Sequence, residues 1–122
     1  LTSDDMNKIY GDILEKYYGH DKGICHIDEL YKNEWSFIPH FYYNFYVYQY
    51  ATGFAASEAL AAKVKSEGEP AVKKYLDFLK AGSSDYPIEI LKNAGVDMNS
   101  PEPIFAVTKK MNQIIDEIEN LL

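Results

Sequence analysis

Residues 39–66 read PHFYYNFYVYQYATGFAASEALAAKVKS, and they form the longest part of the chain with the pattern of a helix. Pro39 suits the first turn of a helix, because its missing N–H would have no partner there. The stretch is uncharged from Phe41 to Ser57, and its second half is rich in small residues, which allow neighbouring helices to approach closely. We therefore predict one long, buried helix over residues 39–66 at the centre of the fold.

Helical spacing also dominates the rest of the chain. Apolar side chains recur at intervals of three and four residues from Ser3 to Tyr18, and Gly19 is a natural stop. Further helices are predicted from Pro70, over Pro87–Ala94 and after the Pro101–Pro103 turn, whereas no stretch alternates at the period of a strand. We predict an all-α fold: a helical bundle of five or six helices around one long central helix, forming a single helical domain over residues 1–122.

Composition excludes several classes of protein. The 122 residues carry a formal net charge of −7, whereas a nucleic-acid-binding protein needs a basic face. The uncharged run of the long helix is shorter than the ~20 apolar residues that cross a membrane, and it contains Asn44 and Gln49. The single cysteine, Cys25, leaves no internal disulfide and fits a reducing compartment. We predict a cytoplasmic protein that binds neither nucleic acid nor membrane.

Tyrosine is unusually abundant, at 11 of 122 residues, and it is concentrated between His40 and Tyr50. On one continuous helix, Tyr43 and Tyr50 would lie about 20° apart, because each residue turns the helix by roughly 100°. Tyr46 and His40 would fall on either side of Tyr43. One face would then present an imidazole and three phenols, which can polarise a carbonyl group or stabilise an oxyanion. Aromatic stripes also occur in ordinary cores, so the pattern alone leaves core packing open.

The pattern of the chain's own residues predicts no metal site. The cysteine–histidine pair Cys25–His26 stands in a loop. Three further residues of types that can bind metals lie nearby: His20, Asp21 and Asp28. Such a pair is a weak signal without the regular ligand spacing of zinc sites. The chain also contains no HExxH, no nucleophile elbow and no glycine-rich phosphate loop.

Residues 35–57, WSFIPHFYYNFYVYQYATGFAAS, resemble the C-terminal part of oligoendopeptidase F. That family is one of the thimet-oligopeptidase-like zinc metallopeptidases. The similarity continues in YYG at residues 17–19, in YLDFLKAGSSDYPIEILKNAGVDMNSPEP at residues 75–103 and in the closing amphipathic helix, so that it covers essentially the whole chain.

The resemblance implies a mostly helical, cytoplasmic endopeptidase that hydrolyses short peptides. Its zinc is implied to be held by the two histidines of an HExxH helix and a later glutamate, all upstream of Leu1. We therefore expect the chain to be a C-terminal fragment that lacks the metal half, binds no zinc with its own residues and is inactive alone. The motif implies that His40, Tyr43 and Tyr50 are catalytic and that Tyr46 binds substrate.

An alternative from another class is a non-catalytic helical module that docks a partner protein or peptide on its aromatic face. A weaker alternative is a pocket for a small aromatic ligand. In each case the separated chain is expected to expose an apolar, tyrosine-rich surface and to self-associate through it, because exposed patches of this kind promote association.

Overall fold

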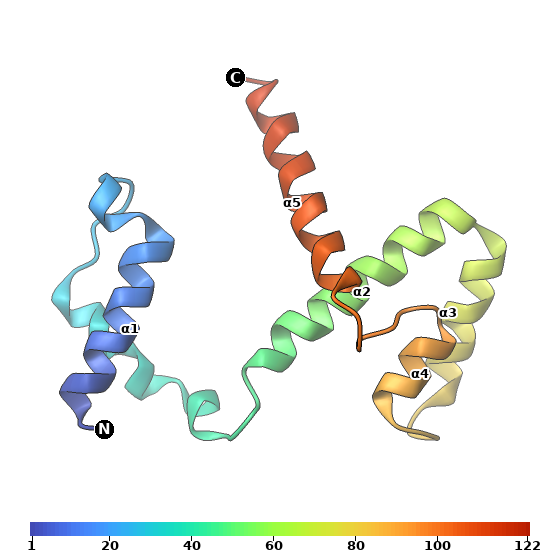
Figure 1. The fold of residues 1–122 in the computed structure, drawn as a ribbon, viewed down its shortest axis with the longest axis horizontal. Helices are drawn as coiled ribbons and strands as arrows, with labels where there is room; N and C mark the ends of the chain where they lie inside the picture. The colour runs from blue at the N-terminus through green and yellow to red at the C-terminus, as the bar shows by residue number, and fades with distance from the viewer. The chain divides into compact units, whose positions relative to one another are not determined.

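Every regular element of the chain is helical. The computed structural model describes residues 1–122 and contains five α-helices and three 3₁₀ helices, with no strand (Figure 1). The predicted all-α class is confirmed. The chain divides into two compact units, Leu1–Val47 and Tyr48–Leu122, and each is described by itself.

The first unit is built on α1, Ser3–Tyr18, whose two ends follow from the sequence. The Asp5 carboxylate accepts hydrogen bonds from the backbone N–H and the hydroxyl of Thr2 at 2.8 and 2.9 Å, and the Asp5 N–H donates back to that hydroxyl at 3.2 Å. These bonds satisfy N–H groups that a helix start leaves unpaired. Gly19 ends the helix at φ 68°, a conformation that glycine adopts without steric penalty. The helix predicted for Ser3–Tyr18 is confirmed.

Three 3₁₀ helices follow in the first unit: η1 (His20–Lys22), η2 (Glu29–Phe37) and η3 (Pro39–Tyr42). Contact between η2 and α1 is close at Gly11, where an added Cβ would stand 2.8 Å from Cδ of Lys32. The Lys32 ammonium lies 2.8 Å from Glu29 and 3.0 Å from Glu15 of α1. Hydrogen bonds to Glu29 and then Glu15 raise the pKa of Lys32. The 3₁₀ helix η2 therefore packs against the side of α1.

The helix predicted over residues 39–66 is wrong in its first third. Only Pro39–Tyr42 is helical there, as a 3₁₀ turn, and α2 spans Tyr48–Glu67. Phe45, between them, has a positive φ of 59°. Asn44 stands in this break, and its short amide side chain favours turns over helix interiors. Tyrosine, phenylalanine and valine also form helices less readily than the alanine-rich sequence of α2.

The second unit consists of four α-helices: α2, α3 (Glu69–Ala81), α4 (Pro87–Asn93) and α5 (Glu102–Glu119). Gly68 joins α2 to α3 with a φ of 68°, so that the chain reverses direction there. Figure 1 shows α3 running back beside α2, with α4 next to α3, whereas α5 starts against α2 and extends away from it. Proline opens α3, α4 and α5, where its missing N–H needs no partner.

The core of the second unit is small. Its buried members are Ala56 and Leu60 of α2 with Ala94 and Val96, which follow α4. Partly buried side chains pack around them: Ala59, Phe78, Leu91 and Met98. No large side chain of the chain is less than 2% exposed. Leu60 is the largest of the four buried core residues. Its side chain packs α2 against the segment after α4.

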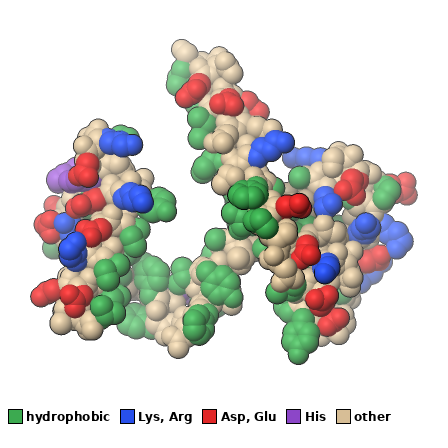
Figure 2. All heavy atoms as spheres, in the orientation of Figure 1, with side chains coloured by type: hydrophobic (Ala, Val, Ile, Leu, Met, Phe, Trp, Pro, Cys, Tyr) green, Lys and Arg blue, Asp and Glu red, His purple; other side chains and the backbone are tan.

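Many large apolar side chains remain at the surface of both units, where Figure 2 shows them as separate green areas. On α5 they include Met111 and Ile118, which are 61% and 51% exposed. None of the helices combines the length and the apolar character that crossing a bilayer requires.

Candidate functional site

His40 lies in η3, and its imidazole is partly buried. Pro39 opens this turn, and the turn closes where the Tyr43 N–H donates to the His40 carbonyl at 3.3 Å. Tyr43 itself is extended, with φ −96° and ψ 113°. A second turn follows at once, because the Tyr46 N–H donates to the Tyr43 carbonyl at 3.3 Å. Two tight turns, not a helix, therefore carry these three side chains.

The turns bring the rings of His40, Tyr43 and Tyr46 together, and we call these three side chains the aromatic trio. The imidazole stacks on Tyr46, with ring centroids 5.5 Å apart and planes inclined by 23°. Tyr43 presents its ring at a steep angle to both others, at 6.4 Å and 87° from His40 and at 6.0 Å and 75° from Tyr46. Each ring thus contacts the other two in a stacked or edge-on geometry that aromatic rings favour.

Phe45 holds the second turn in a strained conformation. Its φ of 59° places it where a turn of this kind normally has glycine or asparagine. A bulky residue in this region costs about 1–3 kcal/mol, and such residues cluster at active sites and ligand-binding loops. The Phe45 side chain is 83% exposed, so burial of its ring within the chain does not offset that cost. The strain coincides with the turn that brings Tyr43 and Tyr46 together.

Tyr50 belongs to the second unit, where it stands in the first turn of α2. The expectation that Tyr43 and Tyr50 lie two turns apart on one helix is wrong, because residues 43–47 are not helical. The Tyr50 side chain is 58% exposed in its own unit.

The trio is accessible. The side chains of Tyr43 and Tyr46 are 58% and 38% exposed, so neither phenol is sealed in a hydrocarbon core. A carbonyl oxygen or an oxyanion at this surface could accept hydrogen bonds from phenolic O–H groups and from an imidazole N–H. Donors held in advance where negative charge develops are the usual means of stabilising an acyl-transfer intermediate.

The loop after α1 has a structural role. The Nδ1 atom of His20 accepts a hydrogen bond from the Ile27 N–H at 2.9 Å, and its ring lies 5.2 Å from that of His26. Asp28 caps η2 by accepting from the Leu30 N–H at 3.0 Å. No group of three or more His, Cys, Asp or Glu side chains that could hold a metal ion is present. The zinc that the resemblance implies therefore does not fit the residues of this chain, and no chemical step is derived through it.

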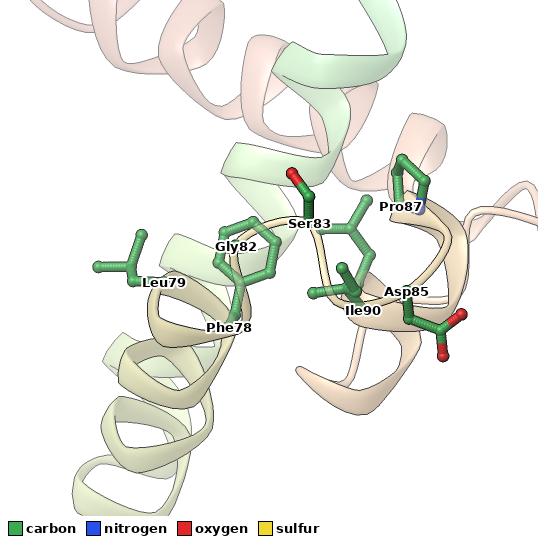
Figure 3. A pocket seen from close by; sticks show the side chains of 8 residues that line it. Phe78, Leu79, Gly82, Ser83, Asp85, Pro87 and Ile90 are labelled. Carbon is green, nitrogen blue, oxygen red and sulfur yellow. The ribbon is translucent and has the colours of Figure 1, made fainter.

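The larger cavities lie elsewhere, in the second unit. One of about 540 Å³ lies between α3 and α4, and Figure 3 shows Phe78 and Ile90 among the side chains around it. Another of about 770 Å³ is lined mainly by apolar side chains of α2 and α3, among them Leu60 and Leu76. Neither cavity is lined by a residue of the trio or by Tyr50.

The sequence model of Peptidase family M3 matches residues 1–109, which is most of the chain. The chain belongs to peptidase family M3. Its relatives include Oligopeptidase PepF of Bacillus subtilis, 55% identical over 122 residues, and the plasmid-encoded Oligoendopeptidase F of Lactococcus lactis subsp. cremoris, 49% identical over 122 residues. The crystal structure of oligoendopeptidase-F from Enterococcus faecium matches 98% of the chain, with a TM-score of 0.80 and 43% identity.

The M3 chain spans about a fifth of the length of these relatives. The aligned region covers all of this chain but only 18% of the B. subtilis protein and 20% of the L. lactis protein, and the structural match covers 22% of the E. faecium chain. The resemblance to oligoendopeptidase F is therefore confirmed, and it concerns one part of those longer proteins.

Sequence reasoning missed the residues that support the trio in this M3 chain. Phe41, next to His40, lies against the ring of Tyr10 of α1. Tyr42 packs on Trp35, whose indole N–H donates to Asn7. No local pattern pairs residues this far apart in sequence. Asn44 was a local signal for the turn, since asparagine favours turns, but a single such residue does not outweigh the helical pattern around it.

Proposed function

We propose that this chain is the C-terminal part of a zinc metalloendopeptidase that hydrolyses short oligopeptides. In this proposal His40, Tyr43 and Tyr50 donate hydrogen bonds to the tetrahedral intermediate, and Tyr46 binds the substrate. The observation that carries the proposal is the convergence of the three rings of the trio in a chain of peptidase family M3. The names of the relatives, oligopeptidase and oligoendopeptidase, support short peptides as the substrate class.

The work of the trio in this proposal is to bind and to polarise. Stacking on Tyr46 limits the rotation of the imidazole, so that its N–H is directed before substrate arrives. Tyr43 adds a phenolic donor from the side. Such preorganisation is effective because the donors need not reorient as negative charge develops on the substrate oxygen. The metal and the activated water belong, in this proposal, to residues outside residues 1–122.

Two further parts of the proposal concern the whole protein. Residues 1–122 would form a single helical domain at the C-terminal end of the peptidase, in keeping with the share of the relatives that they match. A cytoplasmic location is consistent with Cys25, which is an exposed free thiol.

The deciding experiment begins with the coding sequence upstream of Leu1. We expect it to encode an HExxH motif in the same reading frame, and we expect the full-length protein to bind zinc and to cleave short peptides. The 122-residue chain, purified separately, should do neither. An initiator codon directly before Leu1, with no HExxH, would overturn the proposal and favour a non-catalytic interaction module.

We also expect the separated 122-residue chain to self-associate through its aromatic surface. Phe41, Tyr43 and Phe45 are 46%, 58% and 83% exposed, and apolar patches of more than several hundred Å² usually promote association. Sedimentation velocity over a hundredfold range of concentration should show a rising weight-average mass. Phe45→Ser should reduce the effect, whereas a constant monomeric mass for the parent chain would contradict it.

A further inference from the structure

The segment that carries His40 contacts α1 at one point and η2 at another. The ring of Phe41 lies edge-on to the ring of Tyr10, with centroids 6.2 Å apart and planes inclined by 71°. The ring of Tyr42 lies 6.5 Å from Trp35. Since Phe41 and Tyr42 follow His40 directly, these contacts fix the backbone on which the imidazole is mounted.

Hydrogen bonds hold each of these contacts in place. The indole N–H of Trp35 donates to Oδ1 of Asn7 at 2.7 Å, in a partly buried position. The Tyr10 hydroxyl donates to the Glu34 carboxylate at 3.1 Å. On the other side of the turn, the Tyr42 hydroxyl donates to the carbonyl of Ser36 at 3.2 Å. Direct contacts therefore connect Tyr10 of α1 to Phe41, and Asn7 of α1 through Trp35 to Tyr42, and both Phe41 and Tyr42 follow His40 of the trio.

The Tyr10 phenol is well suited to remain a donor. Partial burial, and then the hydrogen bond to the Glu34 carboxylate, raise the pKa of Tyr10 above its ordinary value. A tyrosine hydroxyl is protonated at neutral pH in any case, since its ordinary pKa is about 10, and this shift acts in the same direction.

Asn7 and Tyr10 are three residues apart and therefore lie on one face of α1. The Thr2–Asp5 capping box fixes the start of the helix, and Gly19 ends it. The face that carries Asn7 and Tyr10 therefore belongs to a well-formed helix. The trio segment, by contrast, contains two tight turns and the strained Phe45, which persist only where their surroundings fix them. α1 therefore supports this segment next to His40, directly at Phe41 and through Trp35 at Tyr42.

We propose that Asn7 and Tyr10 are positioning residues that fix His40, Asn7 through Trp35 and Tyr42, and Tyr10 through Phe41. This inference rests on the proposed function of His40. Neither residue needs to touch the substrate. Their effect arises because a displacement of a catalytic group by about 1 Å can lower turnover by as much as about 10²-fold.

The test uses the full-length protein and a double-mutant cycle of Asn7→Ala with His40→Ala. We expect Asn7→Ala to lower kcat about 10- to 100-fold with little change in KM, because the displaced donor acts on the transition state. In the His40→Ala background, Asn7→Ala should cause almost no additional loss, since both changes remove the same contribution. Asn7→Asp keeps an acceptor oxygen in the same place and should restore most of kcat.

The Tyr10 arm has its own matched pair. Tyr10→Ala removes the ring that contacts Phe41 and should lower kcat, whereas Tyr10→Phe keeps the ring and should lower it less. Lys8→Ala is the control on the same helix, because Lys8 only pairs with Asp12 on an exposed face at 2.8 Å. Should Asn7→Ala fail to fold, Asn7→Leu takes its place in the cycle, because it keeps the shape of the side chain and removes the oxygen that accepts from Trp35.

The outcomes separate this inference from the proposed function. Equal losses from Asn7→Ala in the presence and absence of His40 would overturn the positioning role and leave the catalytic role of His40 intact. An unchanged kcat in His40→Ala would remove His40 from the mechanism, and the positioning role with it. A loss in Lys8→Ala as large as that in Asn7→Ala would indicate a general effect of α1 and also overturn the inference.

Discussion

Tyr50→Phe in the full-length protein is expected to lower kcat by about 10²–10³-fold, the loss typical of removing one oxyanion-stabilising donor. The substitution deletes only the hydroxyl. Tyr50 lies in the first turn of α2 and is 58% exposed, so that the change should alter folding stability by no more than about 0.5 kcal/mol. KM should change little if the phenol acts chiefly on the intermediate. Steady-state cleavage of a fluorogenic short peptide measures both constants.

The control for this prediction is Tyr48→Phe, since Tyr48 lies in the same turn of α2 and is similarly exposed at 59%. Its kcat should match that of the unmodified protein. Zinc content should be equal in all three proteins, because the chain holds no group of metal-ligating side chains. Unchanged turnover in Tyr50→Phe would remove Tyr50 from the mechanism, and an equal loss in Tyr48→Phe would point to a structural cause.

Local signals predicted most of the helices. The start and end of Ser3–Tyr18 are encoded within a few residues, by the Thr2–Asp5 box and by Gly19. Proline in the first turn similarly indicates α3, α4 and α5. Such signals suffice where hydrogen bonds between near neighbours decide an end of a helix.

The break between η3 and α2 could not be predicted in the same way. Most residues from 37 to 56 are apolar or aromatic, and none is acidic or a lysine or arginine. The pattern therefore favours one helix, although it includes five other residues: His40, Asn44, Gln49, Thr52 and Gly53. The turn at Tyr43–Tyr46 instead depends on ring contacts within the trio and on contacts with α1. The contact with α1 joins residues far apart in sequence, and the contacts within the trio form only once the turn exists. Hydrophobic periodicity reports neither of them.

In the candidate site, too, the sequence identified residues but not the geometry that brings them together. The motif implied catalytic roles for His40, Tyr43 and Tyr50 and substrate binding by Tyr46, and the structure brings the rings of His40, Tyr43 and Tyr46 together. The geometric reason first given, a common face of one helix, was wrong, because two turns bring the rings together. The role of Tyr50 stays a prediction, and Tyr50→Phe is its test.

Leu60→Ala is the second prediction with a large effect, and it concerns the helix that carries Tyr50. Leu60 is 8% exposed and packs with Ala56, Ala94 and Val96. Removing a buried leucine side chain costs about 2–5 kcal/mol, because the lost transfer energy and the remaining cavity add. A unit the length of Tyr48–Leu122 is stabilised by only about 4–11 kcal/mol, so a large part of its stability should be lost.

Chemical denaturation of the 122-residue chain measures this loss, and repeating it at several protein concentrations separates folding from association. Leu79→Ala is the matched control, because it removes the same atoms from α3, where the side chain is 56% exposed. We expect it to cost less than about 1 kcal/mol. The buried neighbours Ala56 and Ala94 are too small to fill the space, and the larger side chains around the core, Phe78, Leu91 and Met98, would have to move to do so. Equal losses in the two variants would therefore mean that Leu60 does not anchor α2, and that the position of Tyr50 is fixed by contacts outside this core.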